Sequence, residues 1–339
     1  MSDPIDLIPQ DRRDEARAAL AAAFGSTTVT ALEPLTSGAS ALSCRVEVAG
    51  RSYLLRLESS RRDLVRDPYR SYRCMRAAAE AGIAPALHHA DAATGVAVMD
   101  FVPARALSDY PGGAPALARD LGGLVARLQA TPTFPPVASY LTVLEKLLGL
   151  LLDSGLFVPG LLDRHQEGFQ RIREAYPWDD GALVSSHNDL NPSNVLFDGE
   201  RLWLIDWETA YRNDPLADIA ILSIFFAADP ALEAELLEGW LGRDPDRALR
   251  ARLVLMRPLG RLFYGCAASL NAANTSHAVV PAADLTAPTP AQFREAVAQG
   301  RLLAGSPEGQ RLVGKIALAL FLADLATPAF EEALLVARG

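Results

Sequence analysis

Three side chains that could act together in one reaction stand at fixed intervals between residues 187 and 208. Asp189 precedes Asn194 by five residues, and Asp206 follows Asn194 by twelve. A carboxylate can accept the proton of a hydroxyl group, and carboxylate and amide oxygens are ligands that Mg²⁺ prefers. A base and two metal ligands are parts that phosphoryl transfer requires. The intervals therefore indicate phosphate transfer to a hydroxyl group, with Asp189 as the base and Asn194 and Asp206 as the Mg²⁺ ligands.

The same stretch resembles the catalytic loop of protein kinases, His-Arg-Asp followed by four residues and Asn, with Asn188 in place of the arginine. In that pattern the proton goes to the aspartate, so His187 is expected to orient the loop. The alternative is that Asp189 and Asn194 are ordinary turn residues, whose side chains hydrogen-bond to nearby backbone. A bare pattern of this kind arises by chance in about one chain in a hundred at ordinary composition.

The elements that must position these side chains are short apolar runs at residues 182–184, 195–197 and 202–205. Asp198-Gly199 is a tight-turn signal between the last two runs, so they are predicted to form a hairpin. Asn194 and Asp206 would then lie on paired strands, where both side chains can meet one ion.

Further from this stretch, the pattern changes near residue 103. Before it, the sequence predicts strands at 27–32, 42–48, 52–57, 86–89 and 95–102, with helices at 14–24 and 68–81. After it, helical periodicity covers 115–129, 140–152, 161–176, 216–227, 231–241, 247–270, 290–303, 307–323 and 329–336. The fold class is therefore α+β, with a small β-rich lobe at 1–102, a connector near 101–106 and a larger, mostly helical lobe at 103–339.

The small lobe contains candidates for binding a nucleotide. Ser37 and Gly38 lie in a loop of small residues between two predicted strands, where backbone N–H groups could approach phosphates. Neither lysine of the chain lies in the first hundred residues, so a phosphate-binding cation there must be arginine. Arg56, on the third strand, is the candidate for the α- and β-phosphates. The alternative is an edge-strand charge that faces solvent.

By position alone, Met99, Phe101 and Val102 lead into the connector, where backbone groups can pair with an adenine edge. The kinase-like loop implies a nucleotide bound together with Mg²⁺, and the sequence does not distinguish ATP from GTP.

Composition narrows the class of protein. The net charge of −9 and the pI near 5.1 argue against a nucleic-acid partner. The sequence has no apolar stretch of membrane-spanning length and no recognisable secretory signal. Three widely spaced cysteines fit free thiols in a reducing compartment, so cytoplasm is the expected location. The sequence does not determine an oligomeric state.

Three signatures together resemble the aminoglycoside phosphotransferase and choline kinase superfamily, small-molecule relatives of protein kinases. They are residues 187–194, Ile205-Asp206-Trp207-Glu208, and residues 213–218. The resemblance implies a protein-kinase-like, two-lobed fold and an ATP- and Mg²⁺-dependent kinase of a small-molecule hydroxyl. Arg56 and the Asp-Trp-Glu form look more like bacterial choline kinases than drug-resistance enzymes, which favours choline or another amino alcohol as the substrate.

One departure from the family pattern concerns the partner of Arg56. The helix position at which the family usually carries a glutamate falls near Ser71, and no acid lies between Pro68 and Ala79. Arg56 is therefore expected to lack its usual partner and to be less well positioned. Two rival functions stay open: phosphorylation of aminoglycoside antibiotics, and a nucleotide-binding pseudokinase without activity.

The substrate region is predicted from aromatic and acidic residues. Trp207 and Tyr264, with Phe263 and Trp240, could form an aromatic wall for a cationic or aromatic alcohol. Their alternative role is helix core, and Glu208 could either face a substrate cation or end a strand.

Carboxylates that follow Glu208 have a structural interpretation. Asp214-Pro215 has the signature of a helix start, with Asp218 in the first turn of that helix, so structural roles are predicted for both acids.

Overall fold

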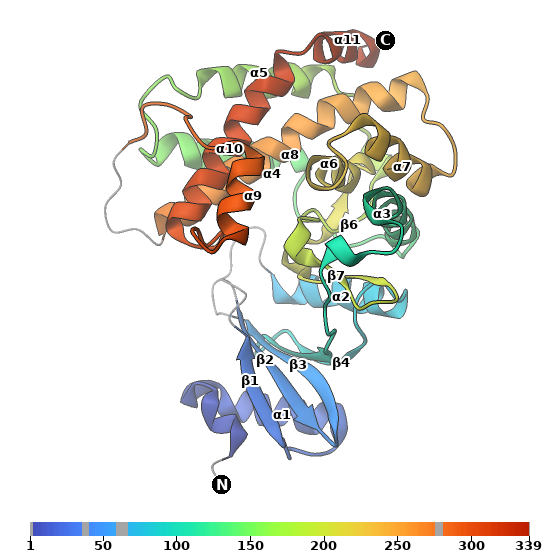
Figure 1. Ribbon diagram of the computed structural model, residues 1–339, viewed down its shortest axis with the longest axis vertical. Helices are drawn as coiled ribbons and strands as arrows, with labels where there is room; N and C mark the ends of the chain where they lie inside the picture. Colours follow the sequence, from blue (N-terminus) through green and yellow to red (C-terminus); the bar gives the residue numbers. More distant parts are fainter. Residues whose placement is uncertain (1–2, 36–40, 59–66, 275–280, 339) are drawn as a thin grey trace. The chain divides into compact units, whose positions relative to one another are not determined.

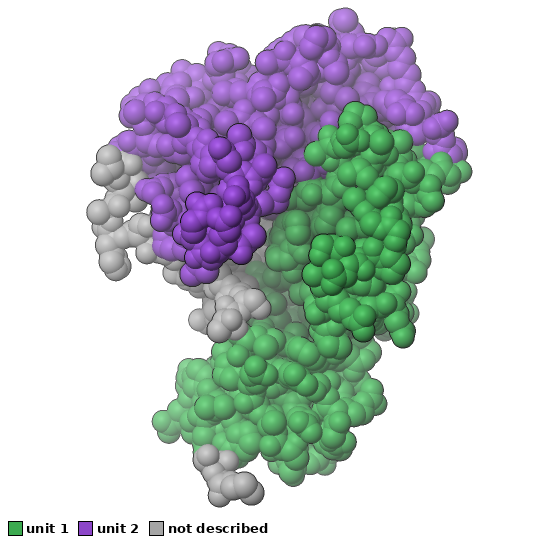
Figure 2. Space-filling view, viewed as in Figure 1, with its two compact units in different colours: residues 1–137, 183–218, 225–242 green, residues 138–182, 219–224, 243–339 purple. Residues whose placement is uncertain are grey.

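The computed structural model describes residues 3–35, 41–58, 67–274 and 281–338, which belong to two compact units (Figures 1 and 2). The first unit comprises residues 1–137, 183–218 and 225–242, and the second comprises residues 138–182, 219–224 and 243–339. Arg56 and the predicted catalytic loop therefore both belong to the first unit.

A five-stranded antiparallel sheet opens the first unit (Figure 1), and its strands lie in the order β1-β2-β3-β5-β4. The strands are β1 (Ala31–Leu35), β2 (Ala41–Val48), β3 (Arg51–Glu58), β4 (Leu87–Asp91) and β5 (Val96–Asp100). Ala49 and Gly50 join β2 to β3, and both have positive φ, as the tightest hairpin turns require. This confirms the predicted hairpin.

One face of the sheet packs into the hydrophobic core, and the other carries charged side chains of β3. Helix α1 (Arg13–Phe24) contributes to the core on one face, where Leu55 and Leu57 of β3 are buried. Because side chains alternate along a strand, Arg56 and Glu58 share the opposite face. The cation and the acid two residues later are thus neighbours by strand geometry.

Helix α2 (Pro68–Glu80) begins as the sequence predicts, with the Asp67 side chain accepting the Tyr69 N–H and proline in the first turn. Just beyond its C-terminus, the Ile83 carbonyl accepts the Leu204 N–H at 3.0 Å. Within the helix, the Cys74 thiol donates to the Ala210 carbonyl at 3.6 Å. Helix α2 is therefore attached to the segment that carries Asp206.

Two small antiparallel ladders flank residues 187–208, which contain the predicted catalytic and metal-binding residues. Strands β7 (Val195–Phe197) and β8 (Leu202–Leu204) form the predicted hairpin, and β6 (Val184–Ser186) pairs with β9 (Tyr211–Asn213). Residues 187–194 connect β6 to β7, and residues 205–210 connect β8 to β9. Both connections are therefore fixed at their two ends by strand pairing.

Helices α3 (Gly113–Gln129) and α7 (Pro230–Leu241) complete the first unit and approach one another very closely. A Cβ atom on Gly122 would lie 2.1 Å from the Leu236 carbonyl oxygen, and one on Gly239 would lie 1.9 Å from the Arg119 carbonyl oxygen. Only glycine fits at these two positions.

Helices make up the second unit. Helix α8 (Arg247–Asn274) packs along α10 (Pro307–Leu325), where a Cβ atom on Gly314 would lie 2.2 Å from the Ser269 hydroxyl. The remaining helices of this unit are α4 (Tyr140–Asp153), α5 (Asp163–Ala175), α9 (Pro290–Ala298) and α11 (Pro328–Ala337). Helix α6 (Leu216–Phe225) follows β9 in the chain, and its residues 219–224 also belong to the second unit.

Several element boundaries differ from the prediction by a few residues, and two of these differences have a local physical reason. Strand β1 begins at Ala31 instead of residue 27, because its extent is set by the register with β2, from Ala31 opposite Glu47 to Leu35 opposite Ser43. Helix α9 ends at Ala298 instead of residue 303, since Gly300 adopts a φ of 68° shortly after it.

None of the helices in the described ranges is, taken singly, long and apolar enough to cross a membrane. Helices α10 and α11 pass this criterion only as a pair, and they are bent by 70°.

Candidate active site

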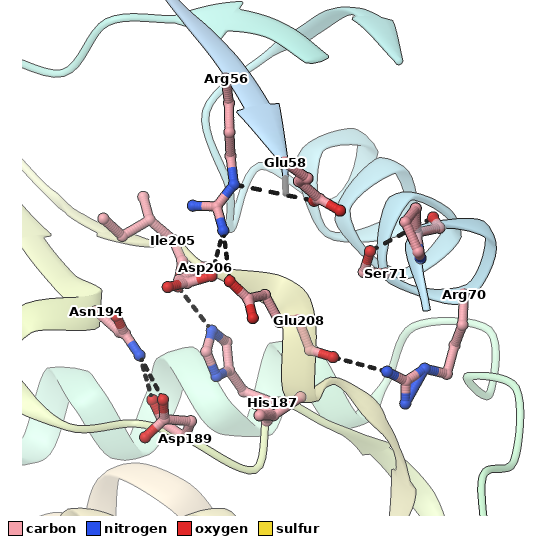
Figure 3. A network of polar contacts seen from close by, with 12 residues as sticks. Arg56, Glu58, Arg70, Ser71, His187, Asp189, Asn194, Ile205, Asp206 and Glu208 are labelled. Carbon is pink, nitrogen blue, oxygen red and sulfur yellow. Dashed lines mark hydrogen bonds and ion pairs between the residues drawn. The ribbon is translucent and has the colours of Figure 1, made fainter. Parts of the chain in front are cut away.

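Asp189 and Asn194 lie side by side in the catalytic loop (Figure 3). The Asn194 amide nitrogen donates to the Asp189 carboxylate at 3.0 Å and to the Asp189 carbonyl at 2.8 Å. Asn191 donates to the other carboxylate oxygen at 2.8 Å. A one-turn 3-10 helix, Pro192–Asn194, brings these residues together. Hydrogen bonds to its charged form keep the carboxylate oriented for accepting a proton.

His187 links the catalytic loop to the segment of Asp206. Its side chain is fully buried, its Nε2 is 2.9 Å from the Ile205 carbonyl oxygen, and its ring lies 4.7 Å from that of Trp207. Nε2 is occupied by the carbonyl and Nδ1 is buried, so neither ring nitrogen is open to an incoming hydroxyl. The geometry therefore fits the predicted role of orienting the loop.

Asn188 stands at the centre of a buried hydrogen-bond network. Its backbone is in the left-handed region, with a φ of 64°, which asparagine tolerates better than most residues. Its amide nitrogen donates to the carbonyls of Thr209 and Tyr211, and its amide oxygen accepts from Asn213 at 2.7 Å. Asn188 thus joins the start of the catalytic loop to strand β9.

Asp218 has a function that the sequence did not reveal. It is fully buried, and its two carboxylate oxygens accept the backbone N–H groups of His187 at 2.8 Å and Asn188 at 2.7 Å. Burial raises the pKa of the Asp218 carboxyl group above its usual range. The structural role predicted for this residue is therefore more specific than stabilising a helix end, because it holds the two residues before Asp189.

Asp206 lies next to Asn194 through the β7–β8 hairpin. The Ile205 N–H donates to the Asn194 carbonyl at 3.0 Å, which continues the pairing of Val195 with Leu204. Asp206 itself has a φ of 66°, and its side chain remains one-third exposed. This turn of the backbone presents the carboxylate at an accessible position instead of continuing the strand.

The oxygen atoms of Asn194 and Asp206 fit a divalent cation of the Mg²⁺ type. Asn194 uses its amide nitrogen for Asp189, so its amide oxygen takes no part in those bonds. No group of three or more His, Cys, Asp or Glu side chains suited to a metal occurs in the described part of the chain. Mg²⁺ is usually held by one or two protein oxygens together with phosphate oxygens, so a two-ligand site agrees with its chemistry.

Arg56 has no acid on α2, as expected, but it has carboxylate partners on other segments of the chain. Its guanidinium donates to Glu208 at 2.7 Å and to Asp206 at 3.0 Å, and its Nε lies 3.9 Å from Glu58 (Figure 3). Burial alone would lower the pKa of Arg56, but the charges of Asp206, Glu208 and Glu58 outweigh burial and raise it. The guanidinium is thus kept charged beside the candidate metal ligands.

Where the family usually carries a glutamate on this helix, α2 has the buried residues Ser71 and Arg70. Ser71 is buried, and its hydroxyl is 3.4 Å from the Pro68 carbonyl of its own helix. Its neighbour Arg70 is also buried and donates to the backbone carbonyl of Glu208 at 2.7 Å. Helix α2 therefore presents a cation to the segment that follows Asp206, where the family pattern leads one to expect an anion.

The nucleotide residues predicted in the small lobe are only partly described. Ser37 and Gly38 lie outside the described residues. Met99 is buried within β5, between Leu54 and Leu87 of the neighbouring strands. Phe101 and Val102 follow the end of β5 and are half-buried, and the guanidinium of Arg45 lies 4.9 Å from the Phe101 ring centroid. The backbone of these two residues is thus outside the β5 ladder.

The residues predicted to contact the substrate belong to different units of the structure. Trp207 is only 2% exposed and packs between His187 and Phe134, so the interpretation as an open aromatic wall is wrong and it belongs to the core. Glu208 is bonded to Arg56. Tyr264 lies half-buried on α8 in the second unit, with its ring edge-on to Phe263.

Comparisons with known proteins agree with this geometry. The model of a family described as "Phosphotransferase enzyme family" matches residues 31–251. A solved choline/ethanolamine kinase family protein from Mesorhizobium loti is 24% identical and has a TM-score of 0.70, with 96% of this chain and 98% of that chain covered. Choline kinase LicA from Streptococcus pneumoniae is 13% identical and has a TM-score of 0.61, with 92% and 100% covered. The predicted α+β fold is confirmed.

A local sequence match points to the same group of proteins. Protein LicA of Haemophilus influenzae is 56% identical over 40 residues, which are 12% of this chain and 15% of that protein. The aligned part thus spans less than a sixth of the relative's length.

Proposed function

Because the chain belongs to the phosphotransferase enzyme family, we propose that it transfers the γ-phosphoryl group of ATP to a hydroxyl group of a small molecule. The observation that carries the proposal is the arrangement of Asp189, Asn194 and Asp206 on two connections that are pinned by strand pairing. In this proposal residues 1–102 contribute the nucleotide side, and residues 103–339 contribute the catalytic loop and the substrate side.

The proposed chemistry begins with Asp189. Its carboxylate accepts the proton of the substrate hydroxyl while the hydroxyl oxygen forms a bond to the γ-phosphorus and the bond from that phosphorus to the ADP oxygen breaks. The hydrogen bonds from Asn191 and Asn194 hold the carboxylate in place. Asn194 and Asp206 would hold Mg²⁺, which supplies positive charge to the phosphate oxygens when bound.

On the nucleotide side, Arg56 would bind phosphate through its guanidinium, and Phe101 and Val102 would offer backbone groups to the adenine. Ser37 and Gly38 would cover the phosphates, and Met99 would belong to the strand that leads to the adenine. Choline or a related amino alcohol is the substrate we favour, because the Asp-Trp-Glu sequence pattern and the LicA match point to that branch. The three buried, unpaired cysteines fit a cytoplasmic location.

A coupled assay of ADP release tests the proposal, with a panel of amino alcohols, sugars and aminoglycosides and with Mg·ATP in excess. Choline or a related amino alcohol is expected to stimulate ADP release. Stimulation by aminoglycosides alone would transfer the assignment to antibiotic phosphorylation. ATP binding without release for any member of the panel would favour a pseudokinase.

The mechanism has its own variant. Asp189→Ala is expected to lower kcat by at least about 100-fold while nucleotide binding persists, since a positioned general base contributes that much or more. Glu200→Ala, which removes an exposed carboxylate from the β7–β8 turn, is the matched control and should retain activity. Unchanged activity of Asp189→Ala would rule out Asp189 as the base.

A further inference from the structure

We propose that Glu208 is the positioning residue for Arg56 and takes over the task of the acid that α2 lacks. This inference rests on the proposed function, because the task is to hold the guanidinium where it can bind nucleotide phosphate. It assigns Glu208 to the phosphate side of the site and not to a substrate cation.

The first support is the geometry of the Arg56 cluster. Of its three carboxylate partners in the described ranges, Glu208 makes the shortest contact, at 2.7 Å, and both side chains of this pair are about 15% exposed. A largely buried charged pair with a direct hydrogen bond interacts more strongly than the longer contact to Glu58, at 3.9 Å. Glu208 is therefore the strongest single partner of Arg56 among the described residues.

The other two partners are less suited to hold Arg56. Asp206 is a candidate Mg²⁺ ligand, so its carboxylate would interact with the metal ion as well as with Arg56. Burial raises the pKa of Glu58, which weakens that side chain as a counter-charge. Glu208 is not a candidate metal ligand, and it accepts a direct hydrogen bond from Arg56 at 2.7 Å.

The second support comes from α2. Arg70 donates to the backbone carbonyl of Glu208 at 2.7 Å, and Arg70 is itself only 5% exposed (Figure 3). The helix thus fixes the main chain of Glu208, and the side chain of Glu208 in turn fixes Arg56. A cation on α2 acts through an acid on the neighbouring segment, so the helix still positions the strand cation, by one additional step.

A double-mutant cycle tests the pair. The variants are Arg56→Gln, Glu208→Gln and the double variant, and Glu200→Gln is the control because it makes the same change of charge at an exposed site. ADP affinity is measured by calorimetry with excess Mg²⁺ and, separately, with EDTA. Thermal unfolding of each nucleotide-free variant is measured in parallel.

Glu208→Gln is expected to weaken ADP binding about tenfold both with Mg²⁺ and with EDTA, which corresponds to about 1.4 kcal/mol. The double variant should bind ADP no more weakly than Arg56→Gln alone, and the changes in Tm should be similarly non-additive. Glu200→Gln should match the wild type. Loss of affinity in EDTA separates this role from metal binding.

Three results would overturn the inference. Additive losses of ADP affinity in the double variant would show that Glu208 acts independently of Arg56, as a merely structural residue would. A loss confined to the Mg²⁺ condition would make Glu208 a metal ligand. Additive changes in Tm would show that Arg56 and Glu208 do not form a stabilising ion pair. If the wild type bound no ADP under either condition, the proposed function would fail as well, which is a distinct outcome.

Discussion

Replacing Asn188 by alanine is the sharpest test of how the catalytic loop is held. The amide of Asn188 is 4% exposed, and its loss deprives the Asn213 amide and the Tyr211 carbonyl of the bonds they make to it. Each buried group left without a partner costs about 1–3 kcal/mol. Alanine in the left-handed region adds about 1 kcal/mol, because its Cβ atom crowds the backbone there. Asn188→Ala should therefore destabilise the fold by about 4 kcal/mol.

Two measurements follow from that magnitude. Tm should fall by about 8–16 °C, since 1 kcal/mol shifts the Tm of a unit of this size by roughly 2–4 °C. At temperatures where the variant is folded, kcat/KM should fall by about 100-fold, because the displaced residue directly precedes Asp189 and an error of 1 Å in position costs about that much. ADP affinity should change little, because Arg56 makes none of these contacts.

Asn188→Gly separates the two contributions. Glycine adopts positive φ without cost, so this variant should lose the hydrogen bonds but be about 1 kcal/mol less destabilised than Asn188→Ala. A Tm for Asn188→Ala within about 2 °C of the wild type would refute the reasoning, because the buried amide would then contribute almost nothing.

Further predictions concern packing, pH and metal. Gly239→Ala should destabilise the protein to urea by about 3 kcal/mol, because its Cβ would overlap a backbone carbonyl, whereas Gly123→Ala, with 3.6 Å of clearance, should be neutral or slightly stabilising. Burial raises the pKa values of Cys74 and Cys266 from 9.0 to about 12. The native state keeps these protons while the unfolded state loses them, so the free energy of unfolding should fall between pH 9 and about 12, by about 1.4 kcal/mol per pH unit for each thiol. Urea titrations across that range would check this, and Cys74→Ala should reduce the slope. EDTA should abolish phosphate transfer and excess Mg²⁺ should restore it, whereas Asp206→Ala should stay inactive at any Mg²⁺ concentration.

The local parts of the site could be predicted from the sequence because short-range patterns encode them. The interval from Asn194 to Asp206 contains an apolar strand, an Asp-Gly turn and a second apolar strand, and these few residues already determine the hairpin. The start of α2 at Asp67-Pro68 was equally predictable from the sequence, because an N-cap residue and a first-turn proline act within one helical turn. Each of these features depends on neighbours in the chain.

The long-range contacts could not be predicted in this way. Arg56 and Glu208 are 152 positions apart, and no periodicity records that one will pair with the other. The pattern around Asp218 indicated only a helix start, because the two N–H groups it accepts belong to residues about 30 positions earlier. Trp207 was open to two interpretations for the same reason, since burial by Phe134 is a property of the folded chain.

The discontinuity of the first unit has a consequence for biosynthesis. The sheet and α3 are made early, but α3 meets α7 only after the ribosome has added the chain up to residue 242, on the order of ten seconds later at ordinary elongation rates. Until then the face of α3 that carries Gly122 is not covered by α7. The nascent chain therefore depends on the sheet and α1 for its first stable core. A contiguous N-terminal fragment ending at residue 137 would expose that same face permanently. A fragment expressed for nucleotide-binding studies should therefore extend to residue 242 instead of ending at residue 137.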